Sequence, residues 1–157
     1  MTRIQSRLDD LGITLPDGVA PVANYVPFVV TGRLVVISGQ ISMDRGTLIS
    51  GILGKDIGLE TGVHAARVCG LNLLTQLHAA CQSVGKSLDD VSRVVRLGGF
   101  VASTPEFTDQ PKVINGASDL MVEVFGDGGR HARAAVGVPA LPLGAAVEID
   151  GMFEITG

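Results

Sequence analysis

The stretch from His131 to Ile155 constrains the fold most, because apolar residues alternate along it with the period of a β-strand on both sides of a Pro-Leu-Gly turn. If its two strands close symmetrically about Leu141 and Pro142, position 134 lies opposite 149 and position 136 opposite 147, which gives one apolar face. The other face then carries four residues: Arg133, Ala135, Glu148 and Asp150. A cation beside two carboxylates is either an exposed ion pair, which contributes little to stability, or a ligand site.

Further strands are predicted upstream. Two β-rich runs, Val26 to Thr31 and Leu34 to Ser38, are separated by Gly32-Arg33, and a two-residue link with Gly first is typical of a type II′ hairpin. A third run, from Ser92 to Ala102, contains Gly98-Gly99, which indicates either a bulge or a close approach of the backbone.

Helices are predicted from apolar residues that recur at intervals of three and four. The pattern covers two long segments, Leu59 to Val84 and Gln110 to Phe125, and a glycine follows the C-terminal end of each. A shorter apolar stripe covers residues 2–12. Residues 42–58 form a glycine-punctuated loop with some strand character. The expected order is ββαβαββ after an N-terminal helix, an α+β fold in which two helices pack on one face of a mixed sheet.

Composition limits the class of protein. A length of 157 residues with 46% apolar residues predicts one domain over residues 1–157, with a helical extension at about 2–12. The net charge is -4 and the basic residues are dispersed, which disfavours binding to nucleic acid. No stretch reaches the length of a membrane-spanning helix and the first residues lack a signal-peptide core, so we expect a cytoplasmic protein that does not bind membranes.

The cysteines and histidines show no metal-ligand spacing. Cys69 and Cys81 lie within one predicted helix, too many turns apart to form a disulfide, so we expect buried reduced thiols. His64, His78 and His131 are scattered. We expect no metal site.

Two motifs resemble those of the reactive intermediate deaminase family, also called Rid, YjgF-like or endoribonuclease L-PSP. The residues that carry the resemblance are Arg133, Ala134, Ala135, Val136, Leu141, Pro142 and Glu148 in the C-terminal stretch, and Ser38-Gly39-Gln40-Ile41 with Tyr25 near the N-terminus. The resemblance covers about residues 19–155, and the N-terminal helix indicates a longer subgroup. It implies the fold of bacillus-type chorismate mutase and a homotrimer with clefts between subunits.

The same resemblance implies a reaction. Family members hydrolyse reactive enamines and imines, such as 2-aminoacrylate and 2-iminopropanoate, to 2-keto acids and ammonia without a cofactor. Arg133 would bind the substrate carboxylate, and Glu148 would position water or transfer a proton. The implied pocket residues are Tyr25, Ser38, Asn115 and the main-chain carbonyl near Ala135, where the family often has Cys.

Other interpretations stay open for these residues. Glu148 could pair with Arg133 or with a neighbouring subunit, Tyr25 could be a half-buried packing residue, and Asn115 could be solvated or capping. The segment from Asn24 to Phe28 departs from the family pattern, so a differently shaped pocket is expected. The alternative function is a carboxylate-binding or regulatory module without turnover, whereas the acidic balance disfavours RNA cleavage and translation inhibition.

Overall fold

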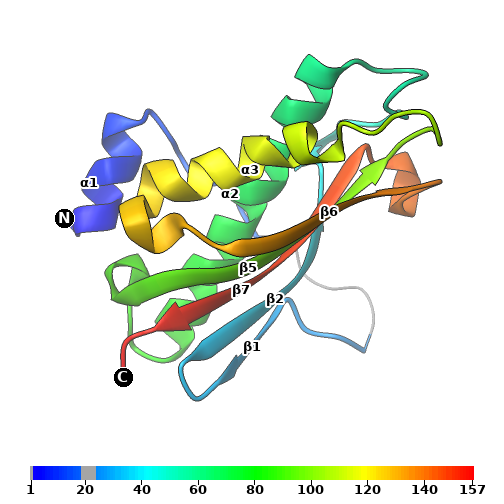
Figure 1. The fold of residues 1–157 in the computed structure, drawn as a ribbon. Coiled ribbons are helices and arrows are strands. Elements are labelled where there is room, and N and C mark those ends of the chain that lie inside the picture. The colour runs from blue at the N-terminus through cyan, green and yellow to red at the C-terminus, as the bar shows by residue number, and fades with distance from the viewer. Residues whose placement is uncertain (1, 19–23) are drawn as a thin grey trace.

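The computed structural model describes residues 2–18 and 24–157, in which helices cover one face of a mixed sheet (Figure 1). The sheet has the order β1 (Phe28–Thr31), β2 (Leu34–Ile41), β7 (Val147–Ile155), β5 (Val91–Ala102) and β6 (Ala132–Val138). Only the β5–β6 pair is parallel. The helices are α1 (Arg3–Asp10), α2 (Leu59–Ser83) and α3 (Gln110–Phe125). The predicted α+β architecture and element order are confirmed.

Smaller elements fill the connections. The predicted loop with strand character contains a hairpin of β3 (Met43–Asp44) and β4 (Thr47–Leu48). Short 3-10 turns are η1 (Leu88–Asp90), η2 (Gly126–Gly129) and η3 (Pro142–Gly144). In the β1–β2 turn Gly32 has a φ of 59° and Arg33 does not have a positive φ, which fits the predicted type II′ turn and excludes type I′.

The predicted C-terminal hairpin is wrong, because β5 lies between β6 and β7. Arg133 pairs with Leu97, which pairs with Gly151 on the far side. Paired residues share a face, so Arg133 and Ala135 lie on the helix-covered face while Glu148 and Asp150 lie on the open face. The connection between the strands contains two prolines and η3 and is too long for a tight turn, so it passes the end of β5 instead.

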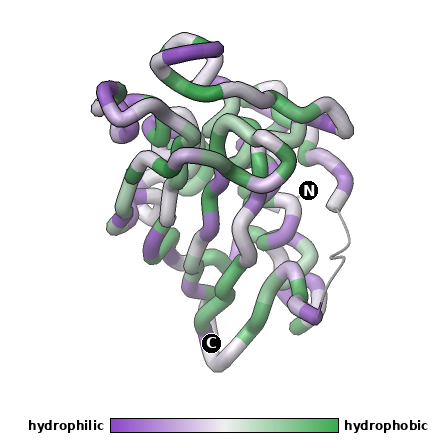
Figure 2. Tube along the Cα trace, turned by 90° about the vertical axis from the view of Figure 1, so that its right-hand side faces the viewer, coloured by the Kyte–Doolittle hydropathy of each residue, from purple (hydrophilic) through white to green (hydrophobic). Residues whose placement is uncertain are grey.

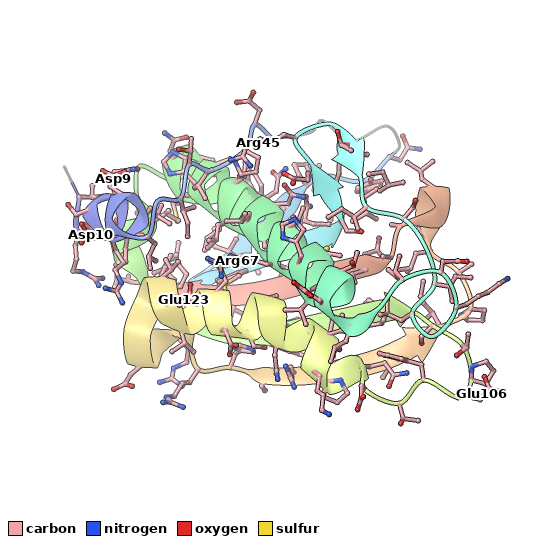
Figure 3. The ribbon with its side chains drawn as sticks, turned by 90° about the horizontal axis from the view of Figure 1, so that it is seen from above. Asp9, Asp10, Arg45, Arg67, Glu106 and Glu123 are labelled. Carbon is pink, nitrogen blue, oxygen red and sulfur yellow. The ribbon has the colours of Figure 1, made fainter. Side chains whose placement is uncertain are left out.

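Glycines let the layers approach closely. A Cβ on Gly116 of α3 would overlap the main-chain oxygen of Val63 on α2, so these helices touch backbone to backbone. On the sheet, a Cβ on Gly99 would lie 2.6 Å from Ile114 of α3. The close-approach interpretation of Gly98-Gly99 is confirmed, and the register shifts of β5 lie nearer its start. Figure 3 shows Arg67 of α2 and Glu123 of α3 between the two helices, where they form an ion pair of 3.2 Å.

The N-terminal helix is attached by its own buried side chains and by a hydrogen-bond acceptor from η1, in the middle of the sequence. Ile4 and Leu8 are fully buried. The carboxylate of Asp89 accepts hydrogen bonds from the main-chain N–H of Arg3 at 2.8 Å and of Ile4 at 2.7 Å. A helix this short is marginal alone, so these tertiary contacts stabilise it.

In the described part of the chain, no helix lies over the other face of the sheet (Figure 1). Apolar side chains on this open face remain exposed: Val29 by 50%, Leu34 by 39%, Val136 by 45% and Met152 by 37%. Figure 2 shows the β1–β2 hairpin as hydrophobic on both sides of its turn. Within residues 2–18 and 24–157, no helix combines the length and apolar character needed to cross a membrane.

Candidate functional site

Arg133 lies on the edge strand β6, half-buried beneath α3, where side chains of the helix hold its guanidinium. Nη1 donates to Oδ1 of Asn115 at 2.8 Å and to Oγ of Ser118 at 3.0 Å. Nη2 donates to the main-chain oxygen of Pro111 at 3.2 Å. The structure therefore brings together two of the predicted site residues, Arg133 and Asn115.

The charge of Arg133 is not neutralised within the described part of the chain. No carboxylate there lies within 4.0 Å of its guanidinium, and Asp150 instead pairs with Arg96 at 3.7 Å. Arg133 therefore forms no ion pair with Glu148 or Asp150 of β7 within one chain. A guanidinium that has N–H groups without an acceptor can bind a carboxylate through two hydrogen bonds.

Ala135 lies two residues further along β6 on the same face as Arg133, and is half-buried. Among the described strands β6 pairs only with β5, so the other edge of β6 leaves main-chain groups without a strand partner. This edge is where a main-chain carbonyl near Ala135 could meet a ligand.

The Ser-Gly-Gln-Ile motif forms a β-bulge beside Glu148. Ile37 pairs with Gly151 and Gln40 with Ile149, so two residues of β2 lie opposite Asp150 alone. A Cβ on Gly39 would lie 3.1 Å from the carboxyl carbon of Glu148. The absence of a side chain at Gly39 therefore lets the main chain of the bulge lie against the carboxyl group.

Ser38 ties the segment that carries Tyr25 to this bulge. The Oγ of Ser38 donates to the main-chain oxygen of Val26 at 2.7 Å, and the main-chain N–H of Ser38 donates to the main-chain oxygen of Pro27 at 2.9 Å. The first strand begins at Phe28 and not at Val26 as predicted, because Pro27 has no N–H to donate to the sheet. Tyr25 is 54% exposed in the single chain, so packing within this chain leaves about half of its surface accessible.

Glu148 is half-buried on the open face, and its environment favours the protonated form. Burial raises the pKa of the Glu148 carboxyl above its ordinary value, and the charge of Asp150 raises it further. A carboxyl group with a raised pKa exchanges protons more readily near neutrality, which is what a general acid–base group needs.

Both cysteines are buried and free, as predicted. Burial raises the pKa of the Cys69 thiol well above its ordinary value, with a smaller contribution from Glu148, and the Sγ donates to the main-chain oxygen of Val147 at 3.4 Å. Burial likewise raises the pKa of Cys81 to about 11. Neither thiol has the depressed pKa of a nucleophile.

Within one chain the predicted residues form two separate groups. Arg133, Asn115 and Ala135 belong to the α3–β6 edge, whereas Glu148 lies on the open face beyond β5, beside the bulge of Ser38 that binds the segment after Tyr25. Two hollows of about 280 Å³ and 310 Å³ lie beside α1, and neither is lined by a predicted site residue. A single chain therefore keeps the predicted residues in two groups, which we call the two candidate half-sites.

Two residues near Arg133 were not predicted from the sequence: Ser118, which accepts from its guanidinium, and His131, whose Nε2 lies 2.8 Å from Oγ of Ser118. Ser118 follows Asn115 by three residues, a spacing that puts both side chains on one face of a helix. His131 precedes Arg133 by two residues, a spacing that puts both on one face of a strand. Those two spacings were the signals that could have identified them.

The fold defines a small α+β protein of the chorismate mutase-like type, and comparison with known proteins gives its family. The family model described as "YjgF/chorismate_mutase-like, putative endoribonuclease" matches residues 5–154. The chain belongs to this YjgF-like, or Rid, family.

Solved structures of relatives differ in how fully they match. The Agrobacterium tumefaciens protein Atu1372, of unknown function, is 47% identical over 98% of this chain and 92% of its own, with a TM-score of 0.88. A Shewanella oneidensis protein described as a putative endoribonuclease is 33% identical over 98% of this chain and 100% of its own, with a TM-score of 0.91. RidA from an Antarctic Psychrobacter is 29% identical over 91% of this chain and 97% of its own, with a TM-score of 0.56. The first two matches span nearly the whole chain, in keeping with a longer subgroup.

Proposed function

We propose that the protein hydrolyses small reactive imines and enamines of the 2-iminopropanoate and 2-aminoacrylate type to 2-keto acids and ammonia, without a cofactor. The observation that carries this proposal is the guanidinium of Arg133, held by α3 with no carboxylate partner among the described residues. Such a group suits a small ligand with one carboxylate. The relationship to RidA, a reactive intermediate deaminase by name, supports the same substrate class.

The reaction needs one water molecule and a group that moves protons. The substrate carboxylate binds Arg133, and ionised Glu148 accepts a proton from water as the water oxygen bonds to the carbon of the protonated imine. Glu148 then returns the proton to nitrogen, the carbon–nitrogen bond breaks, and the hydroxyl proton is lost to solvent as the keto group forms. Ammonia leaves and takes up a proton from solvent, so water supplies the oxygen of the product and Glu148 ends in its starting state.

The two half-sites imply a site shared between chains. Because Arg133 and Glu148 lie on opposite faces of one sheet, we propose that they act on one ligand from neighbouring subunits of a homotrimer. Contact between subunits would also cover the exposed apolar side chains of the open face. Tyr25, Ser38 and Asn115 would complete the cleft, in a cytoplasmic protein that binds neither nucleic acid nor membranes.

A second function is favoured by one observation. The Arg133 half-site is complete without Glu148, so it could bind a keto acid as a non-catalytic or regulatory module. RNA cleavage is disfavoured by the net charge of -4, although the matching family description includes it.

The test is the rate of keto-acid formation from an imine generated in situ by an amino-acid oxidase. We expect acceleration by the wild type and a loss of roughly a hundredfold or more in Arg133→Ala, because a bidentate clamp is removed. Arg130→Ala is the matched control, since Arg130 is exposed on the same segment and, among the residues that the structure describes, pairs only with Asp127 at 3.6 Å. A wild type that binds pyruvate through Arg133 but accelerates no imine hydrolysis would favour the binding module, and cleavage of an RNA substrate would favour a nuclease.

A further inference from the structure

We propose that Ser118 and His131 are positioning residues that fix the orientation of the Arg133 guanidinium through a directional chain of hydrogen bonds. The inference rests on the proposed role of Arg133 in binding a carboxylate. Neither residue reaches the ligand in this account, and both act through Arg133.

The direction of each hydrogen bond follows from donor chemistry. Nδ1 of His131 lies 2.6 Å from the main-chain oxygen of Gly129, and a carbonyl oxygen can only accept, so Nδ1 carries the hydrogen. In the neutral ring Nε2 then has a lone pair, which accepts the hydroxyl hydrogen of Ser118 at 2.8 Å. The lone pairs of the Ser118 oxygen are left to accept from Nη1 of Arg133 at 3.0 Å.

Both ends of this chain are anchored by close packing. A Cβ on the buried Gly129 would overlap the main-chain oxygen of Met121, so the turn η2 is pressed against the last turns of α3 and its carbonyl has a fixed position. Ser118 belongs to α3, whose distance from α2 is set by the contact of Gly116 with Val63. The acceptor at one end and the helix at the other therefore hold His131 and Ser118 rigidly between them.

The consequence is a preorganised fork on Arg133. Nη1 is occupied by Asn115 and Ser118, and one hydrogen of Nη2 by Pro111, so among the described residues Nε–H and the second Nη2 hydrogen remain as two donors for a ligand. A donor pair that is already oriented binds a carboxylate more tightly than a freely rotating one, because less side-chain entropy is lost on binding.

Binding of pyruvate by calorimetry, together with kcat and KM on the imine, tests the proposal. Ser118→Ala should weaken pyruvate binding about tenfold and raise KM more than it lowers kcat, because one hydrogen bond to a charged group is lost while Glu148 is untouched. Ser118→Thr keeps the hydroxyl and should restore binding, and Ser92→Ala, which removes an exposed hydroxyl bonded to Glu154, should change nothing.

The two amide substitutions of His131 separate the two ends of the ring. Gln places its oxygen near the position of Nε2 and can still accept from Ser118, whereas Asn mimics Nδ1 and cannot. His131→Gln should therefore bind pyruvate more tightly than His131→Asn, whereas a merely structural role for the ring would give no such order.

A wild-type measurement that needs no variant is the ¹⁵N NMR spectrum of the His131 ring. The chain of hydrogen bonds predicts the Nδ1–H tautomer, and an Nε2–H tautomer would overturn its direction. Unchanged pyruvate binding in Ser118→Ala, with binding lost in Arg133→Ala, would overturn the positioning role alone. Failure of the wild type to bind pyruvate at all would overturn the proposed function, and the positioning role with it.

Discussion

Substituting Gly116 by Ala should destabilise the protein, because the new methyl group has no space between α2 and α3. Its Cβ would overlap the main-chain oxygen of Val63, which is part of a helix and cannot rotate away. The helices must then separate, and overpacking of this kind costs about 1–3 kcal/mol or more, whereas the better helix propensity of Ala returns at most about 1 kcal/mol. We expect a net loss of about 2 kcal/mol in the free energy of unfolding.

Gly70→Ala is the matched control for this prediction. Gly70 lies on α2 at the same interface, but its Cβ would meet Cδ2 of Leu120 at 2.9 Å, at the flexible end of a side chain. Side-chain rotation and helix propensity should keep this variant within about 1 kcal/mol of wild type. Urea denaturation, with all proteins at one concentration, measures the free energy of unfolding of the two variants and of wild type. A Gly116→Ala protein as stable as wild type would refute the close contact of the two helices.

Two further predictions concern the N-terminal helix and Glu148. Asp89→Ala should lower the free energy of unfolding by about 1–2 kcal/mol in urea denaturation, because the N–H groups of Arg3 and Ile4 lose their acceptor; unchanged stability would show that this carboxylate does not hold α1. Since the folded-state pKa of Glu148 is raised, the stability linked to this group is complete below its unfolded pKa and is lost as the pH rises through the folded value. Glu148→Gln should therefore be more stable than wild type at pH 8 by thermal unfolding, with a smaller difference at pH 4, and an equal difference at both pH values would contradict the raised pKa.

The secondary structure could be predicted closely where the local pattern was strong. The helix expected over residues 59–84 is observed as Leu59–Ser83, and the helix expected over Gln110 to Phe125 has those bounds. Both carry long apolar stripes and end at glycines, and Gly85, with a φ of 72°, has the left-handed conformation that such a stop requires. The bounds of these two helices depend on residues near one another in the sequence, so they could be predicted from one sequence.

The pairing of strands could not be predicted in the same way. Alternation along residues 131–155 requires two strands, but it is satisfied equally by a hairpin and by a connection that passes over a third strand. The choice depends on β5, whose position between β6 and β7 is a matter of contacts distant in sequence. The error moved Arg133 onto the same face as Glu148, and so joined two half-sites that one chain keeps apart.

The surroundings of Arg133 show the same limit. Its three hydrogen-bond partners come from α3, 15 to 22 residues earlier in the sequence. Family resemblance pointed to Asn115, but the hydroxyl of Ser118 and the carbonyl of Pro111 meet Arg133 only because β6 runs beside α3. Sequence spacing can show which side chains share one face of a helix or strand. Which residues of another element contact that face depends on tertiary packing.

The most direct test of the central claim, a site shared between subunits, mixes two inactive variants. Arg133→Ala and Glu148→Gln chains are each assayed alone for imine hydrolysis, and then co-refolded in equal amounts, with subunit exchange verified by native mass spectrometry. If each site takes Arg133 from one chain and Glu148 from its neighbour, about a quarter of the sites in random trimers are intact, and about 25% of wild-type activity should return. If exchange is complete and no activity returns, Arg133 and Glu148 do not act together across a subunit boundary.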